Sequence, residues 1–234
     1  VDKDFPKGVQ ALCRKYGALL VCDEVVTGFR IGVSGAQGYF GIDPDITIFG
    51  KVIAGGYPGA GGIGGKREYM KYLGAGLDSS GKKIHKALVG GTMTANPLSC
   101  CAGYFTLEEI ERTNACQKAG QMGDRICAGL KELVKKHGLP FVVWNTGSIC
   151  HLETVGTMHY QINWKKPWEI PAILGETGIR QKEMEHMGAA YMAEGLVTLA
   201  GSRLYTSAAY TPKMIDQALA CFDRVFENVA VKAD

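Results

Sequence analysis

The spacing of apolar and polar residues in the first part of the chain predicts a helix, a strand, a loop and a second strand, in that order. Residues 7–16 carry apolar side chains at helical spacing and stop at Gly17, which predicts a short amphipathic helix. Residues 18–22 and 45–49 are nearly continuous apolar runs, typical of parallel strands that are buried on both faces. This order of elements favours an α/β sheet.

The second half predicts longer helices and short strands. Asn96 followed by Pro97 is a typical helix start, and Thr211 followed by Pro212 repeats the pattern. Predicted helices cover about 97–112, 115–137, 174–193 and 213–229, and predicted strands cover 141–144, 148–153, 196–199 and 204–207, with a loop at 156–172. A change in composition near 105–115 predicts two domains, residues 1–105 and 106–234.

Composition narrows the classes of partner. The 234 residues carry a net charge of +3, which gives no reason to expect nucleic acid. No apolar stretch approaches the roughly 20 residues of a membrane span. The eight cysteines include no CxxC pair, and the five histidines lack the spacing of a metal site. We therefore expect no metal and no membrane, and reduced thiols in a cytoplasmic protein.

Two reactive side chains follow predicted strands, and a phosphate-suited turn lies further along the chain. Asp23 ends one apolar run, and Lys51 follows another after Gly50. In parallel sheets ligands sit beyond the carboxyl ends of the strands, where both side chains would meet. Further on, Gly91-Thr92 offers neutral donors for a phosphate. An amine, a carboxylate and a phosphate-suited turn are what pyridoxal 5'-phosphate requires. The lysine would form a Schiff base, and the aspartate would keep the pyridine nitrogen protonated.

The glycine-rich run at 54–65 comes shortly after Lys51. It predicts a tight loop where the backbone approaches a ligand or the sheet closely.

Three motifs in order resemble the class III pyridoxal-phosphate aminotransferases, nearest the subgroup around glutamate-1-semialdehyde 2,1-aminomutase. They are DEVVTGFR at 23–30, PDITIFGKVIAGG at 44–56 and GTMTANP at 91–97. The resemblance covers the C-terminal half or so of a family member. It implies an α/β protein of fold type I. Residues 1–105 would be the second part of a large cofactor domain with a mostly parallel sheet, and residues 106–234 an α+β small domain.

The resemblance also implies roles for single residues. Lys51 resembles the Schiff-base lysine that moves protons during catalysis, and Asp23 resembles the partner of the pyridine nitrogen. Val25 resembles the residue that packs on one face of the ring. Thr92 resembles the threonine that reaches the phosphate of the neighbouring subunit, which implies a dimer with shared active sites. Arg203 is a candidate for holding a substrate carboxylate, with an ordinary surface arginine as the competing interpretation.

Several functions remain open on this scaffold. The first is amino transfer between an amino acid or amine and a carbonyl acceptor. The alternatives are an intramolecular aminomutase, a racemase, and a non-catalytic cofactor-binding or scaffolding subunit. Tyr210 stands where many relatives in the aminomutase subgroup carry histidine. The family's Ser-Gly-Thr phosphate turn and ring-stacking aromatic residue would precede Val1. We therefore expect a homodimer, or a complex with a chain that carries the N-terminal half.

Overall fold

The chain forms two compact units in the computed structural model, which describes residues 4–74, 76–83, 85–154 and 165–229. The first unit is Val1–Cys116 and the second is Gln117–Asp234. This division falls later than the sequence-based boundary at 105/106. The reason is that helix α4, Pro97–Thr113, packs on the turn after the second strand and so belongs to the first unit.

A three-stranded sheet organises the first unit. The strands are β1 (Val21–Asp23), β2 (Ile46–Phe49) and β3 (Gly62–Gly65), in the order β1-β2-β3. β1 and β2 are parallel, as the two apolar runs predict, and Asp23 pairs with Ile48. β3 runs antiparallel to β2, so the expectation of a loop throughout 54–65 was wrong for its last four residues. Glycine makes that pairing possible, because a Cβ on Gly65 would lie 2.6 Å from the Asp45 carbonyl oxygen.

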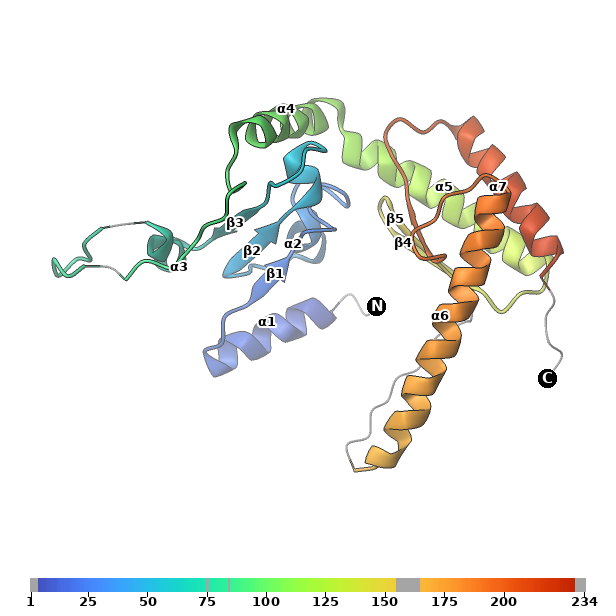
Figure 1. Ribbon diagram of the computed structural model, residues 1–234, viewed down its shortest axis with the longest axis horizontal. Helices are drawn as coiled ribbons and strands as arrows, with labels where there is room; N and C mark the ends of the chain where they lie inside the picture. Colours follow the sequence, from blue (N-terminus) through green and yellow to red (C-terminus); the bar gives the residue numbers. More distant parts are fainter. Residues whose placement is uncertain (1–3, 75, 84, 155–164, 230–234) are drawn as a thin grey trace. The chain divides into compact units, whose positions relative to one another are not determined.

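Helices of different lengths lie around this sheet. α4 lies over the turn that follows β2, and the described residues between η2 and α4 extend away from the sheet (Figure 1). The predicted first helix is confirmed as α1, whereas α2 and α3 had no sequence prediction. The bounds are α1 Phe5–Tyr16, α2 Gly35–Phe40, η1 Lys51–Ala54, α3 Arg67–Met70 and η2 Lys71–Leu73.

The buried carboxylate of Asp45, directly before β2, links helix α1 to the end of β3. Asp45 is 1% exposed. Its oxygens accept hydrogen bonds from the Leu20 backbone N–H, from Lys66 and from Arg14, at 2.8–2.9 Å. The Leu20 N–H and the two cations hold the pKa of Asp45 well below its usual range. The carboxylate therefore stays charged and fixes the start of β2.

The second unit has its own antiparallel sheet. β5 lies between β4 and β6, and the N-terminal part of α6 projects beyond this sheet (Figure 1). The bounds are α5 Ala115–Lys136, β4 Val142–Thr146, β5 Ile149–Glu153, η3 Pro167–Glu169, α6 Ile170–Ala193, β6 Arg203–Tyr205 and α7 Pro212–Glu227.

Most sequence predictions for this unit hold, with two corrections. The strand expected at 196–199 was wrong, because only Leu199 forms an isolated bridge, to Arg203. Of the loop expected at 156–172, residues 156–164 lie outside the described residues. Residues 167–172 do not form a loop, because they belong to η3 and to the first turn of α6. Pro171 is tolerated there because the first turn of a helix has no partner for its N–H.

The core of the second unit is apolar and closely packed. Leu130, Cys150, Tyr191 and Phe222 are at most 1% exposed and belong to one cluster. Helix α5 approaches the β4–β5 turn so closely that a Cβ on Gly123 would lie 2.3 Å from the Gly147 carbonyl oxygen. The sheet and helices of this unit therefore form a core of their own.

Within the described ranges, no helix is long and apolar enough to cross a membrane. Nor do three or more His, Cys, Asp or Glu side chains gather there in a way that could hold a metal ion. All eight cysteines are free thiols.

Candidate functional site

The carboxyl ends of β1 and β2 bring an acid and an amine to one edge of the first sheet. Asp23 closes β1, and Lys51 comes two residues after β2 and opens η1. The strands are parallel and in register there, and the Glu24 N–H donates to the Ile48 carbonyl at 2.8 Å. Both candidate side chains are exposed. The pattern of two apolar runs, each ending in a reactive group, thus correctly located this edge.

Lys51 has an unusual backbone. Its φ is 51°, one of a few positive values at residues other than glycine. That region costs a side-chain-bearing residue roughly 1–2 kcal/mol. Gly50 before it is extended, and Gly55 ends the turn in the left-handed region. Strained backbone of this kind clusters at functional sites, and here it aims one particular amine out of the turn.

Val25 and Asp23 are fixed by short contacts beside this turn. The Val25 N–H donates to Asp23 Oδ1 at 2.9 Å, which orients the carboxylate. The Val25 side chain faces Gly50, since a Cβ there would lie 3.2 Å from Val25 Cγ1. An acid, an apolar side chain and the residue before Lys51 are therefore neighbours. Their roles toward a cofactor stay predictions.

Glu24 has no predicted role, but the structure shows that its carboxylate is buried and fully bonded. Its carboxylate is 1% exposed. It accepts the Ala36 and Gln37 backbone N–H groups at 2.9 and 2.8 Å, and the Thr27 hydroxyl. Glu24 thus binds the start of α2 beneath the site. The available signal was an acid after an apolar strand with a hydroxyl three residues later.

The thiol that precedes Asp23 is held protonated. Burial, together with the nearby Glu24 carboxylate, raises the pKa of Cys22 to about 11. Cys22 is therefore not a nucleophile at neutral pH.

Helix α4 supports the Lys51 turn from behind. A Cβ on Gly103 would lie 2.1 Å from the Ile53 carbonyl oxygen. The Ser99 hydroxyl donates to the Pro58 carbonyl at 2.7 Å. These contacts join the helix both to η1 and to the glycine-rich segment. The position of Lys51 therefore depends on how α4 packs.

Thr92 lies in an exposed turn before α4. The Thr94 N–H donates to the Gly91 carbonyl at 3.0 Å, and Ala95 has a φ of 53°. The Asn96 side chain then accepts the Ser99 N–H at 2.9 Å and caps the helix, as predicted. The hydroxyl of Thr92 is thus open to solvent rather than buried in the first unit.

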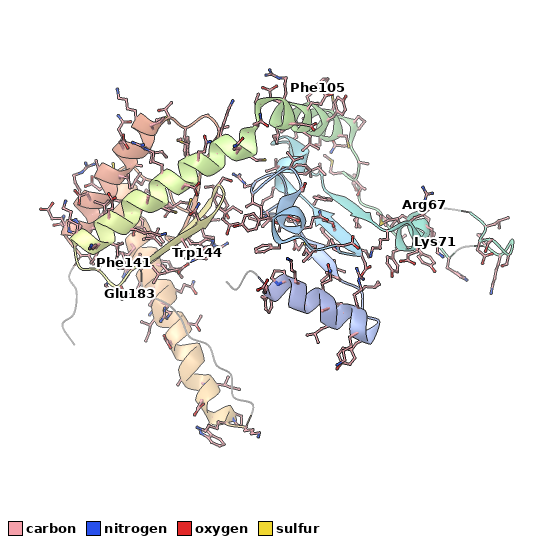
Figure 2. The ribbon with its side chains drawn as sticks, turned by 180° about the vertical axis from the view of Figure 1, so that it is seen from behind. Arg67, Lys71, Phe105, Phe141, Trp144 and Glu183 are labelled. Carbon is pink, nitrogen blue, oxygen red and sulfur yellow. The ribbon has the colours of Figure 1, made fainter. Side chains whose placement is uncertain are left out.

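Arg203 belongs to the second unit, where it opens strand β6. It pairs with His151 across the sheet, and His151 pairs with Trp144 on the other side. The two rings are stacked at 3.9 Å, and Trp144 is labelled on β4 in Figure 2. Burial lowers the pKa of His151, with Glu153 opposing and Arg203 adding to the shift. The role of Arg203 in binding substrate stays a prediction.

The chain is similar to known proteins in sequence and in fold. Glutamate-1-semialdehyde 2,1-aminomutases from Legionella pneumophila and Staphylococcus epidermidis are 41% identical over 146 and 145 residues, which is 62% of this chain and 32% of each relative. An omega-transaminase from Sphaerobacter thermophilus superposes with a TM-score of 0.76 at 22% identity, over 97% of this chain and 48% of its own. A beta-phenylalanine aminotransferase from Variovorax paradoxus gives 0.75 at 21% identity, with the same coverage.

The predicted fold class, an α/β pyridoxal-phosphate-dependent transferase of fold type I, is confirmed by these structures. The chain spans about half the length of the solved structures and matches about a third of the curated relatives. The family described as Aminotransferase class-III matches residues 1–200. The chain, with Lys51 and Asp23 at one sheet edge, therefore belongs to the class-III aminotransferase family.

Proposed function

We propose that this chain carries the lysine-bearing part of a pyridoxal 5'-phosphate-dependent aminotransferase. The enzyme would move an amino group between an amino acid or amine and a carbonyl acceptor. The observation that carries the proposal is the strained Lys51 at the end of β2, beside the parallel strand that ends in Asp23. Membership of the class-III family supports the reaction class.

The residues at this edge fit the cofactor. Pyridoxal phosphate has an aldehyde, a pyridine nitrogen, a flat apolar ring and a phosphate, and when bound it supplies an electron sink for negative charge on the substrate carbon. Lys51 offers an exposed amine and Asp23 an exposed carboxylate. Val25 offers an apolar side chain next to both. Away from this edge, in the turn before α4, Thr92 offers a hydroxyl and a backbone N–H for a phosphate.

Each residue then has a definite task. Lys51 would bind the aldehyde carbon and afterwards carry a proton from and to the substrate α-carbon. Asp23 would hold a proton on the pyridine nitrogen, and its orientation is already set by the Val25 N–H. Val25 would limit the tilt of the ring and exclude water from one face. Arg203 would hold a substrate carboxylate in two hydrogen bonds.

The test is reduction with borohydride after addition of pyridoxal phosphate, followed by peptide mapping. We expect the label on Lys51 and its loss in Lys51→Ala. Lys82→Ala, at an exposed lysine far along the chain, is the matched control and should keep the label. Label spread over several surface lysines, unchanged in Lys51→Ala, would contradict the proposal. So would a folded protein without any label, which would favour the non-catalytic subunit.

An intramolecular aminomutase is the second candidate. It is favoured by the 41% identity to glutamate-1-semialdehyde 2,1-aminomutases over 62% of this chain. Turnover of an amino acid that depends on an added keto acid would identify a transferase. Turnover of an amino-aldehyde without any acceptor would identify a mutase.

The proposal includes a homodimer, or a complex with a chain that carries the N-terminal half. Thr92 is exposed, and large apolar side chains around it are exposed too, including Leu88, Met93 and Leu98. Phe105 on α4 also points away from the sheet (Figure 2). Monomers at micromolar concentration in native mass spectrometry would contradict this part.

We also propose a cytoplasmic location, supported by the free thiols.

A further inference from the structure

The core of the second unit holds two thiols that have no part in the proposed amino transfer. Cys127 lies on helix α5 and Cys150 on strand β5. They are 1% and 0% exposed, and both belong to the same apolar cluster. A pair of thiols from a helix and a strand can cross-link the two elements if the sulfurs are neighbours.

Cys150 lies against the turn of α5 that leads to Cys127. Its Sγ is 3.7 Å from the Gly123 carbonyl oxygen, and a Cβ built on Gly123 would lie 3.3 Å from the same sulfur. Gly123 precedes Cys127 by four residues, and residues four apart share one face of a helix. The glycine therefore lets β5 approach the face of α5 that carries Cys127.

Cys127 in turn reaches from the helix to the same sheet. Its Sγ is 3.7 Å from the Trp144 carbonyl oxygen. Trp144 precedes Asn145, which pairs with Cys150 across β4 and β5. The two thiols also form a hydrogen bond with each other. The sulfurs of Cys127 and Cys150 are therefore neighbours in the core.

The two thiols are not equivalent. The hydrogen bond from Cys150 lowers the pKa of Cys127, with burial opposing this shift and the Lys131 ammonium adding to it. The same bond, together with burial, raises the pKa of Cys150. The thiolate is the form of cysteine that attacks an oxidant. Cys127 is therefore the thiol that reacts first, and Cys150 is the thiol that follows.

We propose that Cys127 and Cys150 form a reversible disulfide when the protein meets hydrogen peroxide. The Cys127 thiolate attacks one peroxide oxygen, an S–O bond forms and the O–O bond breaks. Hydroxide leaves and takes the proton that Cys127 released, which gives water and a sulfenic acid. The Cys150 sulfur then attacks Cys127, the S–S bond forms and the S–O bond breaks. Hydroxide leaves with the Cys150 proton as a second water, so the two sulfurs together give the two electrons that reduce the peroxide.

This disulfide would change the stability of the second unit. Peroxide reaches a buried pair by local opening of the unit, which requires less free energy than global unfolding. The bond then joins α5 to β5 and restricts the unfolded chain between them, which stabilises the folded form. In a reducing cytoplasm such disulfides are transient and respond to oxidants. The cross-link is separate from the residues assigned to amino transfer, so each proposal can fail without the other.

The experiment treats the full chain with excess hydrogen peroxide, unfolds it in urea with iodoacetamide and maps its peptides without reduction. We expect one cross-linked peptide pair that contains Cys127 and Cys150, and before alkylation an intact mass lower by two hydrogen atoms, which dithiothreitol restores. Hydrogen exchange of α5 peptides should be about tenfold slower or more in the oxidised form. Alkylation of both cysteines, cross-links to other cysteines instead, or unchanged exchange would overturn the proposal.

Variants test the order of the two steps, and the wild-type map does not depend on them. Cys150→Ser keeps a hydrogen-bond donor beside Cys127 but cannot form the disulfide, so peroxide should leave a sulfenic acid that dimedone labels at Cys127. Cys127→Ser should give much less dimedone label at Cys150. Cys101→Ala, at an exposed cysteine of α4, is the matched control and should form the cross-link as the wild type does. Equal dimedone labelling in the two serine variants, or loss of the cross-link in Cys101→Ala, would contradict the mechanism.

Discussion

Replacing Gly103 by alanine should loosen the turn that carries Lys51. A Cβ at this position would lie 2.1 Å from the Ile53 carbonyl oxygen, where real contacts are essentially never shorter than 3.0 Å. Helix α4 and turn η1 would have to separate by roughly 1 Å, and overpacking of this kind costs about 3 kcal/mol at the upper end. Alanine returns about 1 kcal/mol of helix propensity. The net loss should be about 2 kcal/mol.

Gly8→Ala is the matched control. Gly8 is also inside a helix, but nothing lies within 4 Å of a Cβ built there. Only the propensity gain remains, so this variant should be stabilised by about 0.5–1 kcal/mol. The difference between the two variants therefore isolates the contact of α4 with the Lys51 turn.

Hydrogen exchange read by mass spectrometry on peptides covering 46–57 and 97–113 is the assay. A loss of 2 kcal/mol corresponds to about 30-fold faster exchange through local opening. Borohydride labelling of Lys51 should fall in the same variant. Protection in Gly103→Ala equal to that in Gly8→Ala would show that α4 does not approach η1 this closely, and the account of how Lys51 is positioned would fail.

Three further predictions test the fold and the site. In urea unfolding, the free energy of unfolding of Lys51→Gly should be about 1 kcal/mol larger than that of Lys51→Ala, because only glycine adopts the positive φ without strain. Equal free energies would mean that the backbone at this position is unstrained. Asn96→Ala should cost about 1 kcal/mol through the lost cap of α4, read by urea unfolding, and an unchanged midpoint would contradict it. Because the pKa of Asp45 is lower in the folded state than in the unfolded state, its carboxylate should stabilise the first unit fully above about pH 4, the unfolded pKa. This stabilisation should be lost as the pH falls toward the lower folded pKa. Asp45→Asn should remove that part of the acid dependence in urea unfolding at different pH values, and an unchanged pH profile would refute the prediction.

The first unit buries two acids, Glu24 after the end of β1 and Asp45 before the start of β2, and satisfies each of them differently. Glu24 is satisfied by two backbone N–H groups and a hydroxyl, whereas Asp45 is satisfied by a backbone N–H and two cations. A charged group that leaves water needs such partners. Each acid stabilises one end of a strand of the β1–β2 pair, since Glu24 follows β1 and Asp45 precedes β2.

Patterns local in the chain could be read from the sequence. Apolar runs predicted the parallel pair β1–β2, and helix caps at Asn96 and Thr211 predicted the starts of α4 and α7. The reactive groups at the strand ends followed from the same runs, since parallel strands place their carboxyl ends on one edge. These features depend on neighbours within a few residues, which is why one sequence sufficed.

The remaining features could not be predicted, because they depend on partners far along the chain. Gly62–Gly65 became a strand because the β2 edge was within reach, and α4 joined the first unit because Gly103 meets Ile53. Glu24 acquired its role from amides 12 and 13 residues away. Local sequence therefore sets which side chains follow the strand ends, whereas long-range packing sets how those side chains are held, because their hydrogen-bond partners come from other elements.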